Sequence, residues 1–151
     1  MKIEKNFMEI KFDALSINEG FARTVVASFA LQLNPTIEEL NDIKTAVSEA
    51  VTNCVVHAYP KQKGEVTITC HIVDDDIYIK IKDDGIGIED VEKAKEPFYT
   101  SKPDQERSGM GFAVMESFMD GVDVQNNQDG AGLSVTMYKK IKNSQSEAVC
   151  D

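Results

Sequence analysis

The sequence contains no apolar run that approaches the length of a membrane span, and its first residues lack the apolar segment of a signal peptide. Cysteine is scarce as well. The three cysteines, Cys54, Cys70 and Cys150, form no C-x-x-C pair and no metal-ligand spacing, and an odd number fits a reducing compartment. We expect the first two to be small core residues and the third to be a tail thiol. These absences predict a cytoplasmic protein.

Basic residues are few relative to acidic ones. Lysine and arginine number 16 against 26 aspartates and glutamates, which gives a net charge of −10 at pH 7. Nucleic-acid binding needs a basic patch, so this balance argues against it. The 151 residues, 42% of them hydrophobic, are enough for one globular domain with a real core. We expect residues 1–141 to form that domain and 142–151 to be a polar, flexible tail.

Apolar periodicity indicates alternating groups of strands and helices. Ser16 or Asn18 is expected to cap the first helix, and Thr36 with Glu39 forms a capping-box pattern before the second. In chain order, the expected elements are a strand (7–12), two helices (18–33 and 37–58), a hairpin (65–73 and 76–82), a long loop (83–108), a helix (109–119) and two strands (122–126 and 133–141). This order predicts an α/β fold of the α+β type, a two-layer sandwich in which helices cover one face of a mainly antiparallel, mixed sheet.

Glu49 and Asn53 lie four residues apart, which places them on one face of the second helix. Mg²⁺ takes oxygen ligands, and the Asn53 carbonyl could supply one without adding charge. Glu49 could deprotonate a group that attacks a γ-phosphate. Taken alone, the pair is better explained as two ordinary residues at a helix surface, because Glu-x-x-x-Asn is a common pairing.

Asp83 follows an expected strand and opens the pattern D-D-G-I-G. A carboxylate at a strand end could accept the exocyclic amine of adenine. Gly85 and Gly87 would let the backbone turn closely around the base. The alternative is an ordinary acidic turn, for which D-D-G is a common signal.

Gly109, Met110 and Gly111 form a G-x-G just before a helical pattern. Backbone N–H groups at such a helix start can reach phosphate oxygens. Lys102 and Arg107 precede it in the long loop, where they could fold over a triphosphate. Solvated loop cations are the alternative. What is specific is the combination of three motifs in this order, and it predicts an ATP–Mg²⁺ site.

These motifs resemble the N, G1 and G2 boxes of the GHKL ATPase superfamily. The likeness is closer to its small anti-sigma-factor serine kinases, and within them to the sporulation branch. The matching stretches are S-E-A-V-T-N (48–53), P-F-Y-T-S-K-P (97–103) and E-R-S-G-M-G-F (106–112), with further likeness at 21–23 and 115–120. The resemblance spans nearly the whole chain and implies the Bergerat ATP-binding fold.

The resemblance also implies a function. Such proteins are dimers that bind and inhibit a sigma factor, here of the sigma-F type, and use ATP and Mg²⁺ to phosphorylate an anti-anti-sigma factor on serine. By position, Glu49 would be the general base, Asn53 the Mg²⁺ ligand and Asp83 the adenine acceptor. Phosphates would be held by Lys102, Arg107, Gly109, Met110 and Gly111. Arg23 would contact a protein partner, a role that rests on the resemblance alone.

The last box departs from the family pattern. Relatives usually carry Gly-Thr there, with a threonine that assists the adenine acid, whereas this chain has Gly130-Ala131-Gly132-Leu133-Ser134. Ser134 or a water would take over that role. The alternatives for function are a binding module that ATP only gates, a detached histidine-kinase ATPase domain and a general-stress anti-sigma kinase.

Overall fold

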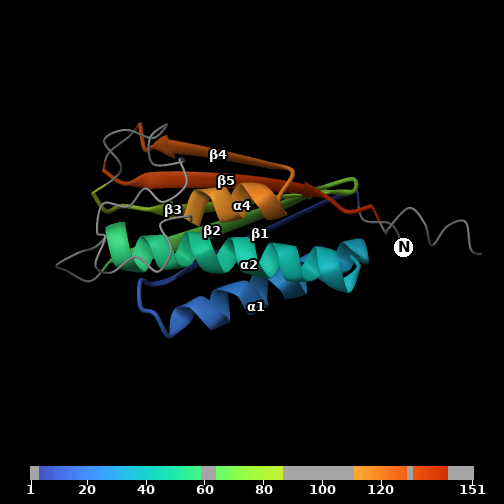
Figure 1. The fold of residues 1–151 in the computed structure, drawn as a ribbon, viewed down its shortest axis with the longest axis horizontal. Helices are drawn as coiled ribbons and strands as arrows, with labels where there is room; N and C mark the ends of the chain where they lie inside the picture. The colour runs from blue at the N-terminus through green and yellow to red at the C-terminus, as the bar shows by residue number, and fades with distance from the viewer. Residues whose placement is uncertain (1–3, 59–63, 87–110, 129–130, 143–151) are drawn as a thin grey trace, which may run out of the picture.

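The computed structural model describes residues 4–58, 64–86, 111–128 and 131–142 (Figure 1). Groups of helical segments and groups of strands follow one another along the chain. The elements are β1 (Lys5–Asp13), α1 (Asn18–Ala30), the 3-10 turn η1 (Leu31–Leu33), α2 (Ile37–Asn53), the π-helical turn η2 (Cys54–Ala58), β2 (Glu65–Val73), β3 (Asp76–Asp83), α4 (Gly111–Phe118), β4 (Gly121–Asn126) and β5 (Leu133–Lys140).

The strands form a five-stranded sheet in the order β1-β2-β3-β5-β4, and every pairing in it is antiparallel. Helices α1, α2 and α4 lie together on one face (Figure 1). The predicted two-layer sandwich is therefore confirmed, with a purely antiparallel sheet rather than a mixed one among the described residues. None of the helices in these residues is long and apolar enough to span a membrane.

Alternation along each strand decides which side chains enter the core. In β3, Ile77, Ile79 and Ile81 are buried beneath the helices, while Tyr78 and Lys80 are exposed on the outer face. The same parity buries Asp83, the last residue of the strand. An acid thus lies on the face that the helices cover, because strand periodicity places it there.

Helix α2 contributes the central apolar stripe of the helical layer. Its buried residues recur at helical spacing: Ile43, Ala46, Val47, Ala50 and Val51. The helix packs against α1 on one side and α4 on the other. Its C-terminal end therefore lies beside the start of α4.

The starts of α1 and α2 agree with the prediction, but their caps were predicted with mixed success. The capping box of α2 is confirmed: the Glu39 N–H donates to Thr36 Oγ1 at 3.0 Å, and the Thr36 N–H donates to Glu39 Oε1 at 2.9 Å. The caps expected for α1 are wrong. Its N-cap residue is Ile17, which makes no side-chain cap bond, while the Asn18 side chain donates to the Asp13 carbonyl at 2.9 Å.

Candidate nucleotide site

Asn53 and Gly111 meet where the end of α2 lies against the start of α4. A Cβ atom built on Gly111 would lie 3.0 Å from Asn53 Nδ2 and 3.2 Å from Asn53 Oδ1. The absent side chain at position 111 therefore leaves the space that the Asn53 carboxamide occupies. The structure brings together a residue of the first motif and a residue of the third.

Asp83 is only 3% exposed at the end of β3, and its two carboxylate oxygens have different partners. Oδ1 accepts the backbone N–H of Gly85 at 2.9 Å and that of Leu133 at 3.2 Å. Oδ2 lies 3.6 Å from Sγ of Cys54, the residue that follows Asn53. The acid is thus held by its own turn, by β5 and by the end of α2.

Burial raises the pKa of Asp83 above its ordinary value, and the neighbouring charge of Asp84 adds a little to this. The backbone N–H groups of Gly85 and Leu133 and the Cys54 thiol oppose the rise by bonding the charged form. Burial, followed by the charge of Asp83, also raises the pKa of Cys54 well above its usual range. Cys54 is therefore a protonated thiol that can donate.

The main chain of Asp83 is fixed as well. Its carbonyl oxygen accepts Asn127 Nδ2 at 2.8 Å, and the same amide donates to the Ala131 carbonyl at 3.0 Å. Gly132 passes directly over this carbonyl with φ of +104°. The turn before β5 and the end of β3 therefore form one bonded unit around the acid.

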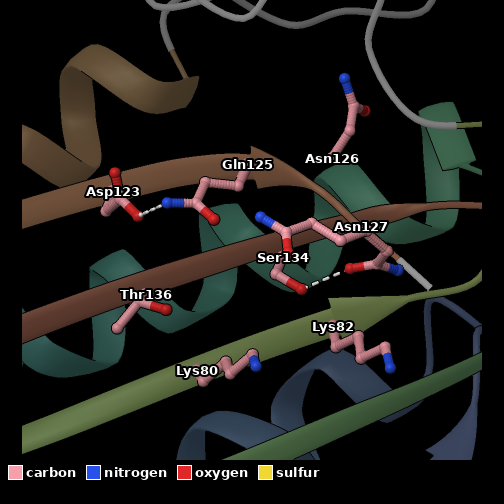
Figure 2. A pocket seen from close by; sticks show the side chains of 9 residues that line it. Lys80, Lys82, Asp123, Gln125, Asn126, Asn127, Ser134 and Thr136 are labelled. Carbon is pink, nitrogen blue, oxygen red and sulfur yellow. Dashed lines mark hydrogen bonds between the residues drawn. The ribbon is translucent and has the colours of Figure 1, made fainter.

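Ser134 does not reach this unit from the inside. It pairs with Lys82 across β5 and β3, and both side chains point to the outer face of the sheet. There its hydroxyl donates to Asn127 Oδ1 at 2.5 Å (Figure 2). The inward residue after Gly132 is Leu133, which is 7% exposed and carries no hydroxyl. The expected assistance of Asp83 by the Ser134 side chain is therefore wrong for a physical reason, the alternation of the strand.

The outer face around Ser134 has a polar hollow of about 310 Å³. Figure 2 shows the side chains along β3, β4 and β5 at this hollow, with the helices behind the sheet. Its lining is made of Lys80, Lys82, Asp123, Gln125, Asn126, Asn127, Gln128, Ser134 and Thr136. The hollow and the Asp83 carboxylate lie on opposite faces of the sheet, so they are separate features.

Of the remaining predicted site residues, two lie on helices and five lie outside the described residues. Glu49 lies on α2 one turn before Asn53 and is half-buried. Arg23 lies on α1, where its guanidinium donates to both carboxylate oxygens of Glu19 at 2.9 and 2.8 Å. Gly87, Lys102, Arg107, Gly109 and Met110 lie outside the described residues.

Three residues that hold Asp83 were not predicted. Cys54 was expected to be only a core residue, and neither Asn127 nor the backbone of Leu133 stood out in the sequence. Leu133 N and Asp83 are separated by 50 residues, and Asn127 and Asp83 by 44. Gly132 was the one available signal, since a glycine before a strand marks a turn or a close approach of two backbones.

Residues 14–139 match the family described as "Histidine kinase-like ATPase domain". The fold also resembles the histidine kinase domain of the Erythrobacter litoralis EL346 blue-light activated histidine kinase. The TM-score is 0.52 at 17% identity over 85% of this chain and 63% of that one, which shows a shared fold alone. The class is therefore that of the histidine kinase-like, or GHKL, ATPases.

Much closer relatives are named anti-sigma F factor. The relative from Clostridium acetobutylicum is 57% identical over 91% of this chain and 95% of its own length. Those from Caldanaerobacter subterraneus subsp. tengcongensis and Clostridium perfringens are 57% and 55% identical, over 90% of this chain and 94% and 97% of theirs. At this identity and coverage, the chain belongs to the anti-sigma F factor family.

Proposed function

We propose that the protein is an anti-sigma factor that binds a sigma factor of the sigma-F type, and that it uses ATP to phosphorylate an anti-anti-sigma factor on serine. Membership of the anti-sigma F factor family supports the first activity. The kinase-like ATPase domain supports the second. The single observation that carries the nucleotide site is that the end of α2 meets both other elements: Asn53 lies against Gly111 at the start of α4, and the next residue, Cys54, lies 3.6 Å from Asp83 at the end of β3.

The two ends of this site suit the two ends of ATP. Asp83 offers acceptor oxygens in a buried place, which suits the exocyclic amine of adenine. Asn53 and the first residue of α4 offer a side-chain carbonyl and a helix start, which suit a metal ion and phosphate oxygens. Bound Mg²⁺ would offset the negative charge of the phosphates. We assign Asn53 as its protein ligand.

Glu49 is the proposed general base. In the transfer, the serine oxygen forms a bond to the γ-phosphorus while the bond from this phosphorus to the leaving ADP oxygen breaks. Glu49, one helical turn from Asn53, accepts the serine proton.

On the adenine side of the site, Gly85 holds Asp83 by donating its backbone N–H to Asp83 Oδ1 at 2.9 Å.

The proposal extends to the loop and the partners. Gly87, Lys102, Arg107, Gly109 and Met110 are proposed to contact the base and phosphates, as their motifs suggest. Arg23 is proposed to contact a protein partner. Its side chain is 41% exposed on α1, where the Glu19 carboxylate orients it, and a partner carboxylate would compete for it.

We further propose a cytoplasmic homodimer in which residues 1–141 form one domain and 142–151 a tail. Because one chain has a mass of 16.7 kDa, light scattering at micromolar concentration should then give twice this mass. A monomeric mass with sigma-factor binding intact would overturn the dimer and leave the anti-sigma activity standing.

Label transfer tests the kinase directly. The purified chain, Mg²⁺ and γ-labelled ATP are added to a lysate of the source cell, and the products are treated with acid. We expect acid-stable label on a small protein. Glu49→Gln should keep ATP affinity while the rate falls by about a hundredfold or more. Acid-labile label would indicate histidine chemistry, and no label with intact ATP binding would indicate a nucleotide-gated binding module.

A further inference from the structure

We propose that Cys54 is a positioning residue for adenine recognition, because its thiol holds the carboxylate oxygen of Asp83 that faces the base. This inference rests on the proposed role of Asp83 as the adenine acceptor. It gives a function to a buried thiol that the transfer step does not use.

The partition of hydrogen bonds at Asp83 points to Oδ2 as the base-reading atom. Oδ1 already accepts two backbone N–H groups, from Gly85 and Leu133. Oδ2 accepts the Cys54 thiol at 3.6 Å. A carboxylate oxygen has about two acceptor sites, so Oδ2 can take the thiol and one amine hydrogen together.

The position of Cys54 in the chain adds a link between the two ends of the site. It directly follows Asn53, and its backbone N–H bonds to the carbonyls of Ala50 and Val51 at the end of α2. Its side chain is 5% exposed and reaches across to β3. A displacement of the end of α2 would therefore move Asn53 and the donor to Asp83 together.

Because Leu133 has no side-chain donor, the orientation of the Asp83 carboxylate depends more on the Cys54 thiol. Leu133 is the inward residue next to Asp83 on β5, and it contributes a backbone N–H to Oδ1 but no side-chain donor. Without the Cys54 thiol, Oδ2 would lose its donor from α2 and the carboxylate could rotate about its Cβ–Cγ bond. The amine of adenine would then meet a poorly oriented acceptor.

Inosine triphosphate is the right probe, because its base carries a carbonyl where adenine carries the amine. With Mg²⁺ and the full chain, we expect Cys54→Ala to weaken ATP affinity by about threefold to tenfold and to change ITP affinity less. Cys54→Ser, which restores a donor, should recover most of the ATP preference. In the kinase assay the loss should appear in KM for ATP rather than in kcat.

Cys70 provides the matched control. It is a thiol buried at 0% exposure among the apolar residues of the core on β2. Cys70→Ala removes the same atoms and should lower the melting temperature without changing the ratio of ATP to ITP affinity. If Cys54→Ala does not fold, Cys54→Val removes the donor while filling the space. An unchanged ratio in the folded variant would overturn the role of Cys54.

Asp83→Asn tests the adenine role of Asp83 separately from the positioning role of Cys54. The amide keeps one oxygen for the two backbone N–H groups and presents a donor in place of Oδ2, so the ATP preference should disappear. If it persists in Asp83→Asn, the adenine role of Asp83 is wrong. If it disappears there but survives in Cys54→Ala, only the Cys54 assignment is wrong.

Discussion

Gly132 lies against the main chain of Asp83, so closely that a Cβ atom at position 132 would overlap the Asp83 carbonyl oxygen. Its φ of +104° is a conformation that side-chain-bearing residues rarely adopt. Two independent requirements, conformation and close approach, therefore select glycine at this position. Both serve the same purpose, which is to join the turn before β5 to the end of β3.

Gly132→Ala should destabilise the fold by about 2 kcal/mol or more, because both the conformation and the overlap with backbone must be relieved. Urea unfolding of the full chain measures this as a lower midpoint. Gly121→Ala is the matched control. A Cβ there meets the ring of Tyr138, a side chain 41% exposed on the outer face that can move away. Equal losses in the two variants would contradict the argument.

Asn53→Ala should weaken ATP affinity with Mg²⁺ present and leave affinity in EDTA nearly unchanged, because the substitution removes only the proposed metal contact. Gly111→Ala tests the same place from α4, since its Cβ would crowd the Asn53 amide at 3.0 Å. We expect the same metal-dependent loss in smaller measure. Titration calorimetry in the two conditions is the measurement. Equal losses with and without Mg²⁺ would exclude the ligand role.

Asp83 should make stability fall as pH rises. Its pKa in the folded state is raised, chiefly by burial, so the folded chain keeps a proton that the unfolded chain has already lost. The contribution of this group is therefore most favourable below its ordinary pKa of 3.8 and declines as pH rises toward the raised value. Asp83→Asn should gain stability relative to the original chain across this window, measured by urea unfolding at several pH values.

Asp74→Asn is the control for that experiment. Asp74 is an exposed acid in the β2–β3 turn with φ of 54°, a conformation that asparagine also tolerates. Its unfolding curves show what the same substitution does at an exposed position. If the Asp83→Asn curves ran parallel to those of the original chain, the raised pKa of Asp83 would not be linked to stability.

Thr36→Ala should reduce stability by about 1 kcal/mol through the loss of the α2 N-cap. Both halves of the capping box are present, so the helix start loses a side-chain acceptor for the Glu39 N–H. Nucleotide affinity should stay unchanged, because Thr36 lies at the opposite end of α2 from Asn53. Denaturant midpoints and ATP titration measure the two effects. A large loss of ATP affinity would mean that the helix transmits changes along its length.

Local signals in the sequence predicted the fold well. The capping box of α2 depends on residues three apart, and the outward and inward faces of β3 depend on alternate residues, so both could be predicted without knowing the tertiary structure. The start of α1 at residue 18 was predicted correctly, but its cap was wrong because the side chain of Asn18 bonds back to Asp13 instead of to the helix. Competing local hydrogen bonds of this kind are not distinguished by residue type.

The surroundings of Asp83 could be predicted only in part. Its place at the end of a strand followed from periodicity, but its partners arrive from α2 and from the turn before β5. The expectation that the Ser134 side chain assists Asp83 was wrong because the register of β5 against β3 decides which of two neighbouring residues faces inward. That register pairs Ser134 with Lys82, and a shift of one residue would have reversed the result.

The pairing of β3 with β5 determines when the surroundings of Asp83 are completed during synthesis of the chain. The strands of the β2–β3 hairpin are neighbours in the chain, whereas the Leu133 N–H comes 50 residues after Asp83. Once the first 128 residues have been made, the chain contains Glu49, Asn53 and the glycines of the D-D-G-I-G and G-x-G motifs. The acid still lacks its β5 donor and the covering turn. The proposed recognition of adenine by Asp83 is therefore completed late, after all the described helices have been translated.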